Sequence, residues 1–194
     1  MLSISVTPSV LEADLAAGRL RCPGCGGPLR AWGHARERSV RTLDGALRTL
    51  RPRRACCERC DATHVLLPAW CVPRRRDGTE VIGAALLGKA HGEGHRRIAA
   101  RLGRPPGTVR GWLRAFTARA EAIEECARRT ASMIDITTVG RDAGSPLATS
   151  VDALGIATRR CRLRLRMSGT PWELAVVLTG GLLHGRTRVP DLEI

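Results

Sequence analysis

The chain has 194 residues, of which 43% are hydrophobic, and a formal net charge of +14. Its longest apolar run, residues 174–183, is shorter than the ~20 residues that a membrane-spanning helix needs, so the composition excludes a membrane protein. Lys89 is the only lysine. Arginine binds phosphate and base edges through its planar fork, but a GC-rich genome also favours it. The distribution of charge along the chain favours phosphate recognition over genome composition as the cause. Residues 1–78 carry a net +7, residues 79–116 +5 and residues 117–194 only +2. A polyanionic partner is therefore expected on the first two segments.

Residues 1–20 are predicted to form an N-terminal helix that Thr7-Pro8 opens and Gly18 ends. They include Glu12 and Asp14 and have no basic stretch of the kind that begins a secretory signal. The sequence contains two Cys-x-x-Cys pairs, and the cysteines that do not belong to them are interpreted as free thiols or small core residues. These features predict a protein of the reducing cytoplasm, associated with the nucleoid.

Two Cys-x-x-Cys pairs separated by 31 residues lie within a region that spans residues 21–76. Each pair places two thiolates on one tight turn, and two such turns joined by a hairpin are typical of a closed, structural zinc site. Cys22, Cys25, Cys57 and Cys60 are therefore predicted to bind one zinc ion. Cys56 is an alternative to Cys57, although the two-residue spacer of the first pair favours Cys57. The alternative of a redox dithiol is disfavoured, because such a motif is typical of a βαβ unit and the sequence shows no such pattern here.

The chain between the two pairs predicts a β-hairpin, from residues 36–42 and 46–53, with its turn at Asp44-Gly45. The hairpin is basic, and its arginines are expected to contact backbone phosphates. These are Arg36, Arg38, Arg41, Arg51, Arg53 and Arg54. His34 and His64 flank the cysteine pairs and are interpreted as surface residues of the hairpin and of a loop, with ligation or contact with phosphate as the alternative.

Residues 77–116 predict a three-helix unit that ends in a helix-turn-helix. Asp77 and Glu80 have the spacing of a capping box at the start of a first helix, residues 79–90. In the next helix Ile98, Ala99 and Leu102 share one face, Gly103 provides a turn with positive φ, and Val109, Trp112 and Leu113 form the inward face of the last helix. The alternative is a helical hairpin that only packs.

The last of these helices is the predicted DNA reader, because its outward residues remain free once the apolar ones turn inward. Arg110 and Arg114 lie four residues apart on one face and are suited to guanine edges or phosphates. The two glycines of this helix would let its backbone approach a groove, although they would also weaken a short helix. The full set of expected DNA contacts is Arg96, Arg97, Arg104, Gly107, Thr108, Arg110, Gly111 and Arg114.

Residues 117–194 predict a helical C-terminal region. One helix is expected over residues 117–134, a second after Ser145-Pro146, and a third after Thr170-Pro171-Trp172-Glu173, which has the form of a capping box. The second helix carries apolar residues spaced alternately by four and three, as in a short coiled-coil seam. This seam predicts either a homodimer through the C-terminal helices or an ordinary helical cap on the core.

Together these motifs resemble the N-terminal DNA-binding part of insertion-sequence transposases. Residues 21–116 are more closely similar to a family of bacterial zinc-ribbon helix-turn-helix proteins of uncharacterised role, through Arg51-Pro52-Arg53-Arg54, Thr63–Pro68 and Gly111-Trp112-Leu113. The resemblance covers about half of the chain. It implies that the cysteine pairs bind zinc, that the protein binds DNA and that the last helix of the unit is the reader.

The sequence thus predicts an α+β, mostly α-helical protein with three parts after its N-terminal helix. These are a zinc ribbon (residues 21–76), a helix-turn-helix domain (77–116) and a helical region (117–194). We expect sequence-specific binding of double-stranded DNA, with no small-molecule substrate and no catalysis. Only 78 residues follow Phe116, and the acids among them do not lie in strand-like runs, as the metal-binding carboxylates of a transposase would. There are two alternatives: an interaction module with a vestigial helix-turn-helix, or a remnant component of a transposition system.

Overall fold

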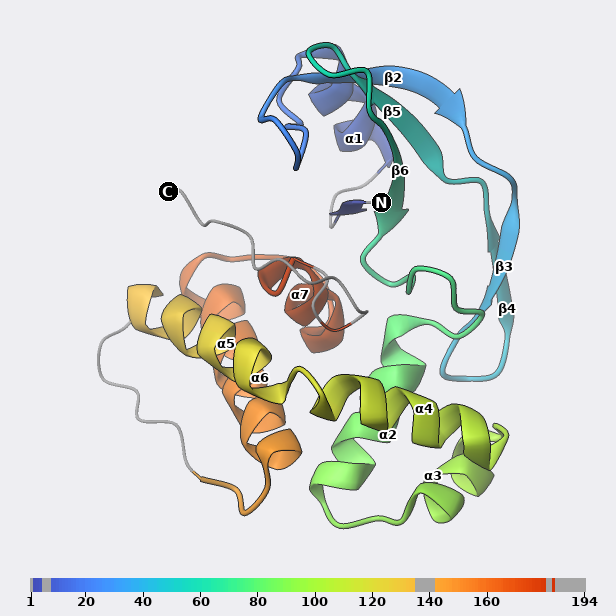
Figure 1. Ribbon diagram of the computed structural model, residues 1–194, viewed down its shortest axis with the longest axis vertical. Coiled ribbons are helices and arrows are strands. Elements are labelled where there is room, and N and C mark those ends of the chain that lie inside the picture. Colours follow the sequence, from blue (N-terminus) through green and yellow to red (C-terminus); the bar gives the residue numbers. More distant parts are fainter. Residues whose placement is uncertain (1, 5–7, 135–141, 181–182, 184–194) are drawn as a thin grey trace.

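The computed structural model describes residues 2–4, 8–134, 142–180 and 183. The fold is α+β, with a strand-rich part at one end of the molecule and a helical part at the other (Figure 1). A long two-stranded extension descends from the strand-rich part along one side toward the helices (Figure 1). The predicted fold class is confirmed at this level.

The strand-rich part is a four-stranded sheet with helix α1 (Pro8–Ala16) against it. Its strand order is β1-β6-β5-β2, in which β1 pairs in parallel with β6 and the other neighbours are antiparallel. The strands are β1 (Leu2–Ile4), β2 (Leu29–His34), β5 (Arg53–Cys57) and β6 (Thr63–Pro68). The sequence predicted α1 and its end at Gly18, which has a φ of 61°, but it did not predict β1 or the strand that β1 pairs with.

The extension is the predicted hairpin, formed by β3 (Arg38–Arg41) and β4 (Leu47–Leu50). Gly45 in its turn has a φ of 87°, a conformation that glycine adopts without steric cost. Val40 on β3 is fully buried together with Leu67 and Cys71, so the hairpin packs on the segment that leads into the helices.

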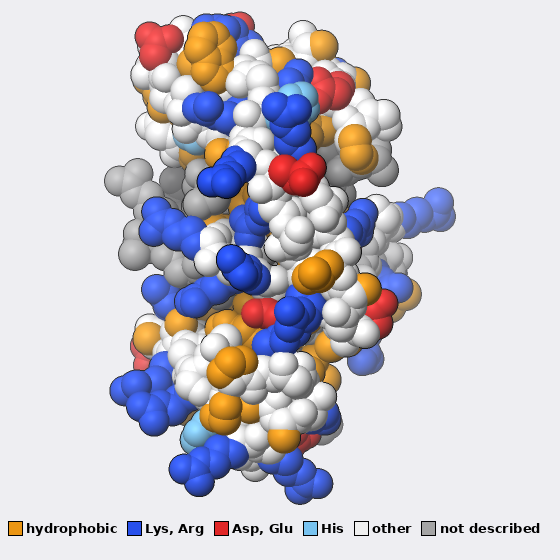
Figure 2. All heavy atoms as spheres, turned by 90° about the vertical axis from the view of Figure 1, so that its right-hand side faces the viewer, with side chains coloured by type: hydrophobic (Ala, Val, Ile, Leu, Met, Phe, Trp, Pro, Cys, Tyr) orange, Lys and Arg blue, Asp and Glu red, His pale blue; other side chains and the backbone are white. Residues whose placement is uncertain are grey.

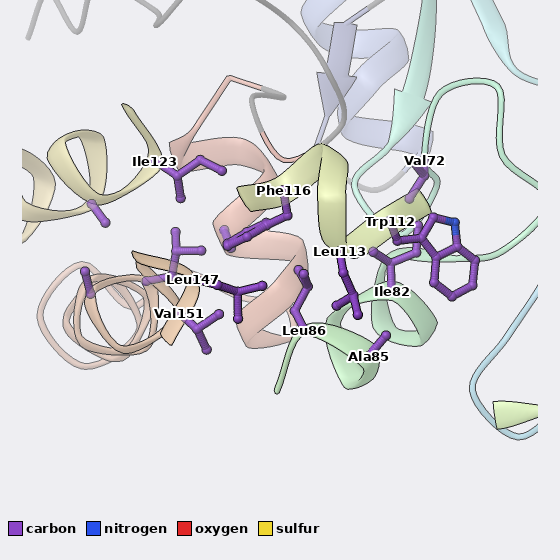
Figure 3. Packing of buried hydrophobic residues seen from close by; sticks show 14 of the residues in the cluster. Val72, Ile82, Ala85, Leu86, Trp112, Leu113, Phe116, Ile123, Leu147 and Val151 are labelled. Carbon is purple, nitrogen blue, oxygen red and sulfur yellow. The ribbon is translucent and has the colours of Figure 1, made fainter. Parts of the chain in front are cut away.

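The helical part begins with three helices, α2 (Thr79–Ala90), α3 (His95–Leu102) and α4 (Pro106–Thr117). The remaining helices are α5 (Ala120–Ile134), α6 (Pro146–Arg164) and α7 (Pro171–Leu178). One hydrophobic core joins all six, and Phe116 of α4 lies at its centre beside Ile123 and Leu86 (Figure 3). Ser145 caps α6, and Thr170 and Glu173 form the predicted capping box of α7.

Two predictions about helix ends were wrong. The helix expected from residue 117 begins at Ala120, after a break at Ala118 and Arg119. The capping box at Asp77 is absent because α2 has Gly78 as its N-cap, with no side-chain hydrogen bond. Asp77 instead forms an ion pair with a residue 27 positions later, which pattern matching over four residues cannot detect.

The seam of α6 is buried within the chain itself. Leu147, Val151, Leu154 and Cys161 all lie in the hydrophobic core, where α6 packs against α5, α2 and α7. Of the predicted seam only Leu165, just beyond the helix, is exposed. The seam therefore serves the fold of one chain, and a homodimer would have to use other residues.

Candidate functional site

The four predicted cysteine ligands come together at one end of the sheet. Their sulfur atoms all lie within 4.8 Å of one another, with 3.4 Å between Cys25 and Cys57 and 3.8 Å between Cys22 and Cys60. Cys22 and Cys57 are buried and Cys60 is exposed. Four sulfurs at these distances can bind one metal ion.

The local backbone supports this cluster. A Cβ added to Gly27 would lie 2.7 Å from the Cβ of Arg59 and 3.1 Å from the sulfur of Cys57, so only glycine fits there. Burial acts to raise the pKa of Cys57, but the amides of Cys60 and Arg59 outweigh it and lower this pKa to about 6. The Ala62 amide acts to lower the pKa of Cys60, yet the sulfurs of Cys25 and Cys57 raise it to about 12. Four thiolates this close repel one another unless a cation neutralises them.

Cys57, not Cys56, belongs to the cluster. Successive residues of a strand point to opposite faces, and the Cys56 thiol donates to the carbonyl oxygen of Asp61 at 3.5 Å. His64, interpreted from the sequence as a loop surface residue with ligation as the alternative, lies on β6 beside the cysteine cluster. Its Nε2 lies 3.4 Å from the Cys22 sulfur, because β6 runs beside β5 and brings residue 64 to the end of the sheet where the four cysteines lie. Cys22 and His64 are 42 positions apart in the sequence.

The second candidate site is the pair of helices α3 and α4, joined by three residues. Gly103 has a φ of 61° and ends α3, with its N–H donating to the Ala100 oxygen. Ile98 and Ala99 on α3, and Val109 and Trp112 on α4, are buried as predicted. The two predicted helices and the glycine turn between them are therefore confirmed, whereas their role as a helix-turn-helix stays a prediction.

The opposite face of α4 is open. Arg110, Gly111 and Arg114 are exposed, and Thr108 is partly exposed. A Cβ added to Gly107 or Gly111 would meet nothing within 4 Å in the described structure, so internal packing does not require either glycine. On α3, Arg96 and Arg97 are also exposed. This face can therefore approach a large partner closely.

Several arginines predicted to contact DNA have partners inside the protein instead. Arg53 forms an ion pair with Glu12 at 2.8 Å and so holds α1 on the sheet. Arg38 donates to the carbonyl oxygens of Val72 and Arg75. These two arginines support the fold, and their predicted phosphate contacts stay predictions. Arg54 donates to Thr63 across the sheet at 3.4 Å.

Arg104, another predicted DNA contact, also has a partner inside the protein. Its side chain is only 9% exposed, and its Nε lies 2.6 Å from a carboxylate oxygen of Asp77, itself 14% exposed. The Nε hydrogen does not point at a described acceptor, so the contact is an ion pair, while Nη1 donates to the Gly103 carbonyl at 2.7 Å. Arg104 thus joins the α3–α4 turn to the segment before α2.

Other predicted phosphate contacts remain available, since Arg36 and Arg51 are exposed and Arg41 is partly exposed. Three further arginines, which had no predicted role, are exposed beside the hairpin: Arg74, Arg75 and Arg76. Arginine and lysine side chains are spread over this face of the molecule, from the strand-rich end to the helices (Figure 2).

The acids of the C-terminal region do not form a catalytic cluster within the described residues. Asp142 lies in a loop, Asp152 is exposed on α6 and Glu173 is part of the α7 cap, whereas Asp135 lies outside the described residues.

Residues 22–102 match a family described as a domain of unknown function (DUF6431), a segment that runs from the first cysteine to the end of α3. No curated protein and no solved structure matches the chain significantly. Among the described helices, none has the length and apolarity to cross a membrane.

Proposed function

We propose that the chain is a zinc-stabilised, sequence-specific DNA-binding protein that has no catalysis of its own. In this proposal α3, the turn at Gly103 and α4 act as a helix-turn-helix, and α4 enters the major groove. The observation that carries the proposal is the two-sided character of α4. Its inward residues are buried, and its outward face pairs two arginines with two glycines that the fold itself does not require.

The metal in this proposal is zinc. Four thiolates around one point suit a tetrahedral ion with soft ligands and leave no open position for a substrate. The ion would hold residues 22–27 against the end of β5, with Cys22, Cys25, Cys57 and Cys60 as ligands. His64 would support the site from outside by its contact with Cys22.

Selection from a randomised pool of duplexes tests this function. The full-length, zinc-loaded chain should enrich a defined motif at near-physiological salt, and Arg110→Ala should relax selection at one base pair by about 1–3 kcal/mol. Arg51→Ala, which changes an exposed arginine far from α4 in sequence, should leave the enriched motif unchanged. If folded, metal-loaded protein enriched nothing, the protein would be an interaction module or a purely electrostatic binder rather than a reader of sequence.

Gly111→Ala separates the proposed role of α4 from its stability. Alanine in an exposed helical position should stabilise the protein by up to about 1 kcal/mol, since it limits the unfolded backbone and favours helix. The same methyl group would stand between the helix and the groove, so affinity for the enriched duplex should fall about tenfold or more. Chemical denaturation and fluorescence anisotropy on one preparation measure both effects.

Gly155→Ala is the matched control for this substitution. Gly155 is also a helical glycine whose added Cβ would meet nothing within 4 Å, but it lies on α6. It should show the gain in stability with unchanged DNA affinity. A Gly111→Ala variant that is stabilised and binds as well as the parent would show that this face of α4 does not approach DNA.

A further inference from the structure

Six arginines line a groove between strand β3 and the loop of residues 73–77. Glu37 is the only acid among the described residues that line it. We call this feature the arginine groove, and it consists of Arg36, Arg38, Arg41, Arg74, Arg75 and Arg76.

The arginine groove has a fixed shape. The Arg41 N–H donates to the Arg76 carbonyl at 2.7 Å, and the Gly78 N–H donates to the Arg41 carbonyl at 2.8 Å. Arg38 donates to the carbonyl oxygen of Arg75 in the loop and to that of Val72 just before it, and is therefore a positioning residue. The loop and the hairpin are thus held together before any ligand binds, which lowers the entropic cost of ligand binding.

The other five arginines have no carboxylate partner. Within the described part of the chain, no hydrogen bond or ion pair engages the side chains of Arg36, Arg41 and residues 74–76, and Glu37 is the one acid beside them. Arg38, in contrast, donates through Nη2 to two carbonyl oxygens. Five guanidinium groups around one groove repel one another, and an anion that carries several charges would relieve this repulsion. Guanidinium forks match phosphate oxygens in shape as well as charge.

The chemistry of the lining favours a duplex over a single strand. Single-stranded nucleic acids are held by aromatic rings on which bases stack, and no aromatic residue is among those that line the groove. The nearby Trp70 is covered by Arg48, whose guanidinium carbon lies 4.2 Å from the ring centre. The groove therefore suits regularly spaced phosphates rather than splayed bases.

The position of the groove connects it to α4. Asp77 is the last residue of the loop, and its carboxylate is paired with Arg104 in the turn between α3 and α4. One short covalent and ionic path therefore fixes the groove relative to the start of α4.

We propose that the arginine groove binds the sugar–phosphate backbone of the same duplex that α4 reads, and that it supplies affinity without sequence preference. This inference rests on the proposed function. It assigns Arg74, Arg75 and Arg76 to DNA binding and gives Arg38 a supporting role.

The test compares two double variants that remove equal charge. Arg75→Gln/Arg76→Gln changes the groove, and Arg162→Gln/Arg164→Gln changes two exposed arginines on α6. Binding of each to the enriched duplex and to a scrambled duplex is measured from 50 to 300 mM salt. Each lost phosphate contact should make the slope of log K against log salt shallower by about 0.9, so the groove variant should lose about 1.8 and the α6 variant nothing. The groove variant should weaken both duplexes equally and keep the ratio between them.

The outcomes separate this proposal from the proposed function. If the parent enriches a motif but the groove variant behaves like the α6 variant, the groove proposal fails and the function of α4 stands. If the parent enriches nothing but the groove variant alone loses salt-dependent binding, the proposed function fails and the groove still binds a polyanion. A loss confined to a single-stranded RNA probe, with duplex binding intact, would overturn the assignment to a duplex.

Discussion

Cys57→Ser should abolish tight zinc binding and unfold the strand-rich end of the protein, and Cys25→Ser should do the same. Both sulfurs belong to the four-cysteine cluster, and a closed site with three thiolates binds zinc far more weakly. Apparent binding free energies of structural zinc are about 10–16 kcal/mol near neutral pH, as large as the whole stability of a small domain. Zinc content of the purified protein and its thermal unfolding with and without a chelator measure the effect.

Cys56→Ala is the control, because it changes the neighbouring thiol on the opposite face of β5. It should keep one equivalent of zinc. The strand-rich part and the helices have separate hydrophobic clusters, so the chelator should remove the structure of the first while most of the helical circular dichroism persists. Loss of zinc from Cys56→Ala, or its retention by Cys57→Ser, would contradict the assignment.

Asp77→Ala should destabilise the protein by about 3 kcal/mol, which is the second large effect that we expect. The substitution leaves the guanidinium of Arg104, only 9% exposed, without its carboxylate, and an uncompensated buried charge is costly. Chemical denaturation should detect this loss. DNA affinity should fall as well, since the ion pair connects the α3–α4 turn to the arginine groove.

The ion pair of the exposed Arg128 with the partly exposed Glu124 provides the comparison for Asp77→Ala. These residues are four apart on α5, and the Arg128 side chain is 49% exposed, so Glu124→Ala should change stability by less than about 0.5 kcal/mol. Asp77→Leu combined with Arg104→Met should recover much of the stability but not the DNA affinity. Equal effects of Asp77→Ala and Glu124→Ala would show that burial does not strengthen the role of Asp77.

Local patterns predicted the parts of this structure that local interactions decide. Gly103 was correctly predicted to form the turn, because a glycine between two helices with apolar faces indicates a residue with positive φ. Cys57 was preferred over Cys56 on spacer length alone, and the alternation of side chains along β5 gives the physical reason. The capping box at Thr170 was found because its two partners are three residues apart.

The errors concern partners that are distant in sequence. β1 was missed because three residues pair with β6 more than sixty positions later. His64 was interpreted mainly as a surface residue, because its contact with Cys22 depends on that same sheet. Arg38 and Arg53 look like free cations in the sequence, and only the fold shows that they bind a backbone carbonyl and a carboxylate of the same chain. A count of basic residues therefore overestimates how many can bind a partner.

The division of α4 into a buried and an open face has a consequence for how binding preferences change. Thr108, Arg110 and Arg114 contribute little to the core, so substitutions at these positions should alter stability by no more than about 0.5 kcal/mol. The matched segment ends at Leu102, before α4 begins. If α4 reads DNA as proposed, single substitutions at these positions change the preferred target without cost to the fold. In that case a library randomised at the three positions should yield folded variants that select different duplex sequences.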